Sequence, residues 1–306
     1  MHDRAGTALD TSASGGTMDS TNALIRVVDQ PGLDTVAKPL SNAIRRAYSR
    51  AGETGRVAKN ALHGVWLGHP LHPVFTDVPI GAWTTGLVLD AVGAVSGDDG
   101  FERAADVAMA VGLVGAAGAA VTGLTDWSET QGRSRRTGLL HGLLNLTATV
   151  LYATAYALRK NGARPAGTSC AIAGYSIALG AAFLGGDLVY DQRVGVTHAD
   201  VAEPEQFSAV ADTAWLHDNT MIRAKTEDAD ALLVRQHGRV CGLAHACSHL
   251  GGPLSEGTLK DGSVVCPWHG SEFALDDGHV VNGPATVSQP TLDVRERNGR
   301  IEIKAI

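Results

Sequence analysis

Four long apolar stretches dominate the middle of the chain, at residues 78–96, 104–124, 139–158 and 168–190. Each has roughly the 20 residues that an α-helix needs to cross a bilayer, and none carries Lys or Arg. They are apolar all round, and small residues such as the segment GAAGAA (115–120) suit close packing of membrane helices. The pattern predicts four transmembrane helices, with a buried bundle in a soluble protein as the alternative.

The sequence pattern changes near residue 207, where short runs of alternating hydrophobic and polar residues begin. Examples are TLDVRER (291–297) and GRIEIKAI (299–306), and turn signals such as KDG and RNG separate the runs. Alternation with a period of two is typical of half-buried β-strands. The fold class predicted is therefore an α + β chain of two domains, a four-helix transmembrane bundle followed by an all-β sandwich or barrel.

The remaining segments complete the expected domain organisation. Residues 1–21 are small and polar and lack a basic start followed by an apolar core, so we expect a disordered tail and no secretory signal. Residues 22–65 are mildly basic and amphipathic, with Pro31 and Pro39 as breaks, and predict short juxtamembrane helices. The membrane domain is expected at 66–190, a linker at 191–206 and the β domain at 207–306.

Charge restricts the partners and suggests an orientation. A net charge of -7 and a pI near 5.9 argue against nucleic acid as a partner, and four cysteines do not suggest a disulfide scaffold. Most Lys and Arg flank the side of the helices that carries the N-terminus, although Arg159, Lys160 and Arg164 lie on the other side. We therefore expect a multi-pass protein of the plasma membrane with both termini in the cytoplasm.

Candidate metal chemistry lies in the segment CSHLGGPLSEGTLKDGSVVCPWHG (247–270). Its pattern is C-x-H-x16-C-x2-H, with Cys247, His249, Cys266 and His269 as candidate ligands. Two cysteines and two histidines suit a zinc ion, and they also suit a [2Fe–2S] cluster with two thiolates on one iron and two imidazoles on the other. The glycine-bearing flanks HLGGPL and PWHGS form two matched loops, which favours the cluster between them.

The segment CSHLGGPLSEG…CPWHGSEFALDDG resembles the cluster-binding signature of Rieske [2Fe–2S] proteins, and the resemblance covers residues 207–306 almost without gaps. It implies that Cys247 and Cys266 bind the inner iron and His249 and His269 the outer iron. It also implies that Pro284, in the segment NGPA, belongs to a proline loop that covers the cluster.

This sequence departs from the respiratory branch of that family. Gly251 and Trp268 stand where the branch has a disulfide, and Phe273 stands where it has a tyrosine that donates to a ligand sulfur. Ser271, which resembles the branch's serine donor to a bridging sulfide, is kept. Fewer hydrogen bonds to sulfur imply a lower reduction potential, and the missing disulfide fits a reducing compartment.

Residues 62–196 resemble the DUF2231 family of four-span membrane domains, which has no assigned chemistry. Ionisable residues in a membrane are costly and therefore suggest function. The possibilities are helix caps and hydrogen bonds between these residues, a site for a quinone headgroup, or axial ligands of a b-type haem. The candidate residues cluster at the predicted cytoplasmic ends of the spans and are His69, His72, Asp126, His141 and Asp187.

The resemblances favour a membrane-tethered carrier of single electrons, with a redox protein or a quinone as partner and the lipid bilayer as support. A redox sensor or a scaffold with a structural cluster is the alternative. A Rieske oxygenase would need a mononuclear iron in a large domain after the cluster. Only 37 residues follow His269, so that function is disfavoured.

Overall fold

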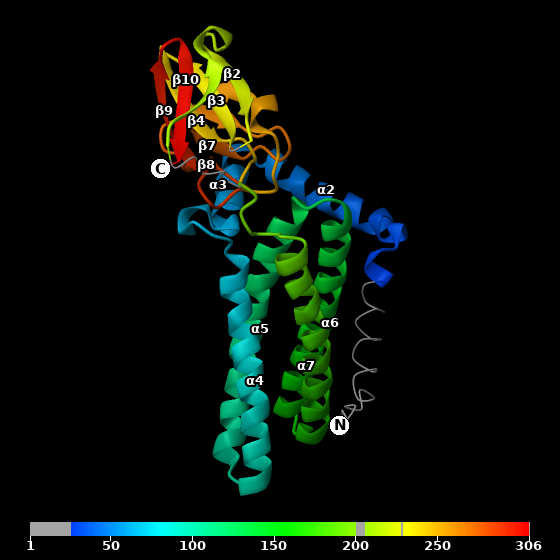
Figure 1. Cartoon of the computed structure of the whole chain (residues 1–306). Helices are drawn as coiled ribbons and strands as arrows, with labels where there is room; N and C mark the ends of the chain where they lie inside the picture. Colours follow the sequence, from blue (N-terminus) through cyan, green and yellow to red (C-terminus); the bar gives the residue numbers. More distant parts are fainter. Residues whose placement is uncertain (1–25, 200–205, 228, 306) are drawn as a thin grey trace, which may run out of the picture.

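A long helical domain carries a smaller β domain at one of its ends (Figure 1). The computed structural model describes residues 26–199, 206–227 and 229–305. The predicted tail at 1–21 lies outside the described residues, as does part of the predicted linker.

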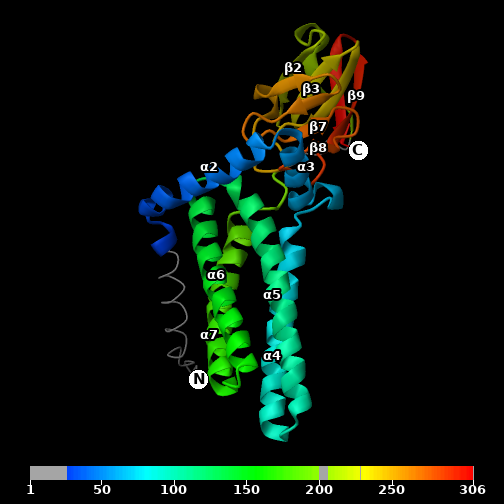
Figure 2. The same ribbon diagram turned by 180° about the vertical axis from the view of Figure 1, so that it is seen from behind.

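Four helices form the body of the helical domain. They are α4 (His72–Ser96), α5 (Asp99–Ser128), α6 (Gly132–Lys160) and α7 (Arg164–Gly186), which continues as a π-helical turn, η3 (Asp187–Asp191). α4 packs along α5 and α6 along α7 (Figures 1 and 2). Glycines allow the first pair to approach closely, because a Cβ on Gly112 would lie 2.1 Å from Nε1 of Trp83 and one on Gly118 would lie 2.4 Å from the ring of Phe75.

The helical domain contains more than the predicted four-helix membrane bundle. α2 (Asp34–Arg50) and α3 (Gly52–His63), flanked by the short turns η1 (Pro31–Leu33) and η2 (Val65–Leu67), lie in the segment 22–65 where short helices are expected. In the described residues, three helices are long and apolar enough to cross a membrane, and they run over His72–Ser96, Asp99–Ser128 and Arg164–Asp191. α6 is less apolar, since His141 and Asn145 interrupt its hydrophobic stretch.

α2 and α3 pack against the end of the bundle that faces the β domain (Figures 1 and 2). Tyr48 Oη of α2 lies 2.8 Å from Thr125 Oγ1 of α5. Lys59 of α3 pairs with the buried carboxylate of Glu129 at 2.7 Å. Polar contacts between these segments, far apart in sequence, fix α2 and α3 to the bundle.

A network of charged residues closes the opposite end of the bundle. Arg159 Nη1 donates to Asp90 Oδ1 at 2.9 Å and to Asp106 Oδ1 at 3.3 Å. Arg164 contacts Asp106 at 3.2 Å and Glu102 at 2.7 Å. Lys160 lies 3.9 Å from Asp106, so all three cations that oppose the predicted orientation are paired with acids at this end.

The β domain consists of two antiparallel sheets. One has the strand order β1-β10-β9-β4-β3-β2 and the other β5-β6-β7-β8. Buried Leu232, Leu243, Val264 and Phe273 form a core that also contains Cys247 and Cys266. The strands are β1 (Ser208–Asp212), β2 (Thr220–Lys225), β3 (Asp230–Gln236), β4 (Arg239–Ala244), β5 (Thr258–Lys260), β6 (Ser263–Val265), β7 (Glu272–Ala274), β8 (Val280–Asn282), β9 (Thr291–Arg297) and β10 (Arg300–Ala305), with 3-10 turns η4 (Thr213–Trp215) and η5 (Leu254–Glu256).

Candidate metal centre

Two loops of the same backbone design present the four candidate ligands. In the first loop (245–253), Cys247 N donates to Gly252 O and Gly251 N donates to Cys247 O, each at 2.8 Å. In the second loop (266–271), Cys266 N donates to Ser271 O at 2.8 Å and Gly270 N to Cys266 O at 3.1 Å. Gly251 and Gly270 both have a positive φ, +75° and +77°, where other residues are strained. The matched loops predicted from the glycines are therefore present.

The loops bring the four predicted ligand side chains together as two pairs. The buried thiols of Cys247 and Cys266 hydrogen-bond to each other. The rings of His249 and His269 lie with centroids 5.0 Å apart, nearly perpendicular. His249 Nδ1 is buried and has no hydrogen-bond partner in the described residues. Burying a ring nitrogen without a hydrogen-bond partner costs free energy unless a ligand binds it. The environment of His249 Nδ1 therefore fits a metal-binding nitrogen.

The electrostatics of the site favour the metal-binding forms of Cys266, His249 and His269, but not that of Cys247. The hydrogen bond from the Cys247 thiol lowers the pKa of Cys266 to about 7, aided by the backbone N–H groups of Trp268 and His269. The same hydrogen bond, together with burial, raises the pKa of Cys247. Burial lowers the pKa of both His249 and His269, so both imidazoles are neutral. A thiolate and neutral imidazoles are the states that bind metals.

Small and polar residues support the two loops. A Cβ on Gly252 would lie only 2.7 Å from Cys266 Sγ, so a side chain there would crowd the site. Ser271 Oγ is buried and accepts from Ala285 N at 3.0 Å, which ties the second loop to the proline loop (282–286). Phe273, at the position of the expected tyrosine, is fully buried and offers no donor. The cysteines of the described residues are all free.

Gln289 is a residue of this site that the sequence patterns do not reveal. Its side chain is buried and its Oε1 accepts from Ser248 N, within the first loop, at 2.9 Å. Its Nε2 donates to the carbonyl oxygens of Ala244 and Ala246, both at 2.7 Å. These three hydrogen bonds connect Gln289 to the backbone of the first loop and to the last residue of β4. Gln289 belongs to no recognisable sequence motif, so its role in the site can be identified only from the folded structure.

The structure gives no support to haem or quinone in the membrane domain. His72 and His141 do lie near each other, with ring centroids 6.4 Å apart. However, His141 Nδ1 hydrogen-bonds to Ala181 O at 2.8 Å and its Nε2 lies 3.1 Å from Asn145 Nδ2. His72 Nδ1 bonds to Ala119 O at 2.9 Å, which leaves its Nε2 as the nitrogen able to bind a ligand. Both nitrogens of His141 are engaged, so neither is left for an iron.

The other candidates of the membrane domain do not join these two histidines. His69 is exposed and only lies near Pro70 O, at 3.3 Å. Asp126 pairs with the buried His63 at 2.6 Å. Asp187 accepts from Gln192 Nε2 at 2.6 Å. His72 and His141 therefore lie together, whereas His69, Asp126 and Asp187 have other hydrogen-bond partners.

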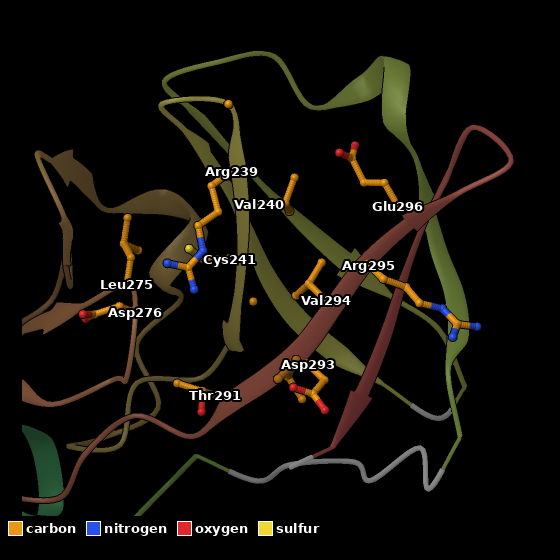
Figure 3. A pocket seen from close by; sticks show the side chains of 13 residues that line it. Arg239, Val240, Cys241, Leu275, Asp276, Thr291, Asp293, Val294, Arg295 and Glu296 are labelled. Carbon is orange, nitrogen blue, oxygen red and sulfur yellow. The ribbon is translucent and has the colours of Figure 1, made fainter.

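A cavity of about 410 Å³ lies elsewhere in the β domain, between β4, β9 and the segment at Leu275 (Figure 3). Cys241 lines it beside side chains of both charges, including Arg239, Asp276 and Asp293. None of the four candidate ligands lines this cavity. It is therefore separate from the metal centre.

Comparisons with known proteins divide the chain in the same way. The model of the Rieske [2Fe-2S] domain matches residues 206–293, and the model of the predicted membrane proteins DUF2231 matches residues 68–198.

Individual relatives match parts of the chain. Mouse apoptosis-inducing factor 3 is 36% identical over 74 residues, which are 24% of this chain and 12% of that protein. Ferredoxin CarAc of Metapseudomonas resinovorans is 33% identical over 57 residues, 19% of this chain and 53% of the ferredoxin. The Rieske iron-sulfur subunit of the cytochrome bc1 complex of Corynebacterium glutamicum is 32% identical over 81 residues, 24% of this chain and 20% of the subunit. The chain thus spans 12% of the mouse protein and 16% of human apoptosis-inducing factor 3.

Among solved structures, apo dicamba monooxygenase superposes with a TM-score of 0.31 at 29% identity, over 33% of this chain and 34% of that one.

Proposed function

Since the chain joins a Rieske [2Fe-2S] domain to a DUF2231 domain of predicted membrane proteins, we propose that it is a membrane-anchored carrier of single electrons. The observation that supports this most directly is the pairing of two buried thiols with two neutral imidazoles on matched loops, with His249 Nδ1 left without a partner among the described residues. We assign Cys247 and Cys266 to one iron and His249 and His269 to the other. When bound, the cluster would take up and release one electron without making or breaking a bond.

Backbone N–H groups of this chain would stabilise negative charge at the proposed centre. Backbone N–H groups at His249 and Leu250 donate to the sulfur of Cys247, and those at Trp268 and His269 donate to Cys266. Hydrogen bonds to sulfur stabilise negative charge. Relatives named as a ferredoxin and as a subunit of the cytochrome bc1 complex support a transfer role and a redox protein as partner. A quinone is the alternative partner.

We propose the domain boundaries of the sequence analysis for this carrier, with residues 66–190 in the plasma membrane and the Rieske domain in the cytoplasm. α6 would cross the membrane with the three apolar helices, since it packs along α7 and α5 and has 29 residues. At 1.5 Å per residue that is about 43 Å, enough to span a bilayer. Arg133, Arg135 and Arg136 begin α6 beside α2, which supports a cytoplasmic location for the end that carries the Rieske domain.

The test of the proposed function is the spectrum and reactivity of the anaerobically purified full chain in detergent. We expect the absorption and EPR signals of a Rieske cluster, reduced and reoxidised rapidly by a reductase or by a quinol. Colourless protein, or protein holding zinc, would contradict the proposal. A cluster that exchanges no electrons with either donor would favour the structural or sensing role instead.

The reduction potential is a separate prediction. Phe273 offers no hydrogen bond to a ligand sulfur, and the described cysteines form no disulfide. We expect a potential below that of Rieske proteins that oxidise quinols, near the lower end of the range of about −150 to +300 mV for these centres. A redox titration followed by EPR measures it. A value at the top of that range would show that loss of these donors does not set the potential.

A further inference from the structure

The helical domain and the segment that follows it contact all three loops of the proposed cluster site. His198 N donates to Ser248 O, in the first loop, at 3.0 Å. Gln131 Nε2 lies 2.9 Å from Nε2 of His269, in the second loop. Asn60 Oδ1 accepts from Gly283 N, in the proline loop, at 3.0 Å. The cluster-binding end of the β domain therefore faces the helical domain, as Figures 1 and 2 also show for α3 and β8.

Of these contacts, only that of Gln131 reaches a proposed iron ligand through a side chain. Gln131 precedes α6, and its carbonyl accepts from Arg135 N at 3.3 Å in the first turn of that helix. The preceding residues are buried and fixed, since Glu129 pairs with Lys59 and Thr130 Oγ1 donates to Trp127 O at 2.8 Å. The backbone position of Gln131 is therefore set by the helical domain, and its exposed side chain reaches His269 from there.

The chemistry of the ring determines what this amide does. His249 presents its Nδ1 as the atom without a partner among the described residues, and by the matched design of the loops we assign Nδ1 of His269 to iron as well. A neutral imidazole bound through Nδ1 carries its proton on Nε2 and donates from there. The amide of Gln131 has a donor and an acceptor on equivalent positions, so a half-turn places its Oε1 where Nε2 is placed now.

We propose that Gln131 of the membrane domain accepts a hydrogen bond from Nε2 of the iron-binding His269 and thereby lowers the reduction potential of the cluster. The physical reason is that ferric iron withdraws electron density from the ring. The N–H is then a better donor in the oxidised state, and an acceptor stabilises that state more than the reduced state. This inference rests on the proposed function, and it makes the potential depend on a residue outside the Rieske domain.

The test compares Gln131→Leu with wild type in the full chain, by redox titration at a fixed neutral pH. Leucine cannot accept the hydrogen bond, so we expect a higher potential, with the reduction equilibrium shifted about three- to tenfold, or up to about 59 mV for one electron. Gln131→Glu keeps an acceptor and adds negative charge, so its potential is expected at or below the wild-type value. Pulsed EPR of the reduced cluster should show a change at one histidine ligand in Gln131→Leu.

The matched control is Gln236→Leu. Gln236 is a half-buried glutamine that likewise makes side-chain hydrogen bonds, but its partners are Lys260 O and Gly262 N and it lies in β3, away from the proposed ligands. We expect its potential to equal that of wild type. An unchanged or lower potential in Gln131→Leu, with full iron and sulfide content, would overturn the inference. Failure of the proposed function would appear differently, as a wild-type chain without a redox-active cluster.

Discussion

Replacing Cys266 with alanine is expected to abolish the [2Fe-2S] cluster, with iron and acid-labile sulfide falling from about two of each per chain to near zero. Cys266 is buried in the second loop and hydrogen-bonds to Cys247 in the first. Thiolates hold one of the two irons on their own side of the cluster, so a single remaining cysteine leaves that iron without sufficient ligands. Iron and sulfide assays with EPR of the dithionite-treated protein measure the loss.

Cys241→Ala is the matched control for this experiment. Cys241 is a half-buried cysteine of the same domain, in β4, and it lines the cavity of Figure 3 rather than the metal centre. We expect it to retain its iron and its EPR signal. For the histidine pair, His249→Ala should lose the Rieske signal, whereas the exposed His237, paired with Asp261 at 2.9 Å, should be replaceable. A normal signal in Cys266→Ala would refute the ligand assignment.

Arg159→Ala is expected to destabilise the helical domain by about 3–5 kcal/mol, the usual cost of leaving a buried charge without its partner. The side chain of Arg159 is 1% exposed, and those of Asp90 and Asp106 are 10% and 15% exposed. Arg164 also contacts both acids, at 3.5 and 3.2 Å, and compensates only in part. Thermal unfolding of the detergent-solubilised protein, followed by helical circular dichroism, measures the change.

The neighbouring Lys160 provides the control. Its side chain is 55% exposed and lies 3.9 Å from Asp106, so Lys160→Ala should cost less than about 1 kcal/mol. The network lies at the end of the bundle opposite the β domain (Figure 1), and the EPR signal of folded Arg159→Ala should therefore match wild type. Equal stability of Arg159→Ala and Lys160→Ala would show that the buried network contributes nothing.

The helical half shows where reasoning from the sequence is limited. Long apolar runs identified the helices α4, α5 and α7, because length and hydropathy are local properties. The sequence also predicts that α6 spans the membrane, but α6 is not among the three apolar helices, since His141 and Asn145 interrupt its hydrophobic stretch. These two residues hydrogen-bond to each other and to the backbone. The same contacts engage both ring nitrogens of His141, one of the imidazoles that suggested haem. Hydrogen-bond partners of this kind depend on which helices become neighbours.

The β half was more predictable from the sequence, for a physical reason. Alternation, turn residues and the spacing of the four candidate ligands are short-range features, and a cluster needs its ligands on two compact glycine loops. By itself, the sequence therefore determined the order of the domains and the candidate ligand set. Only the tertiary structure decided which residues surround that set. Gln289 supports the first loop and Gln131 of the helical domain reaches His269, because the folded chain brings together residues that are far apart in sequence and carry no motif of their own.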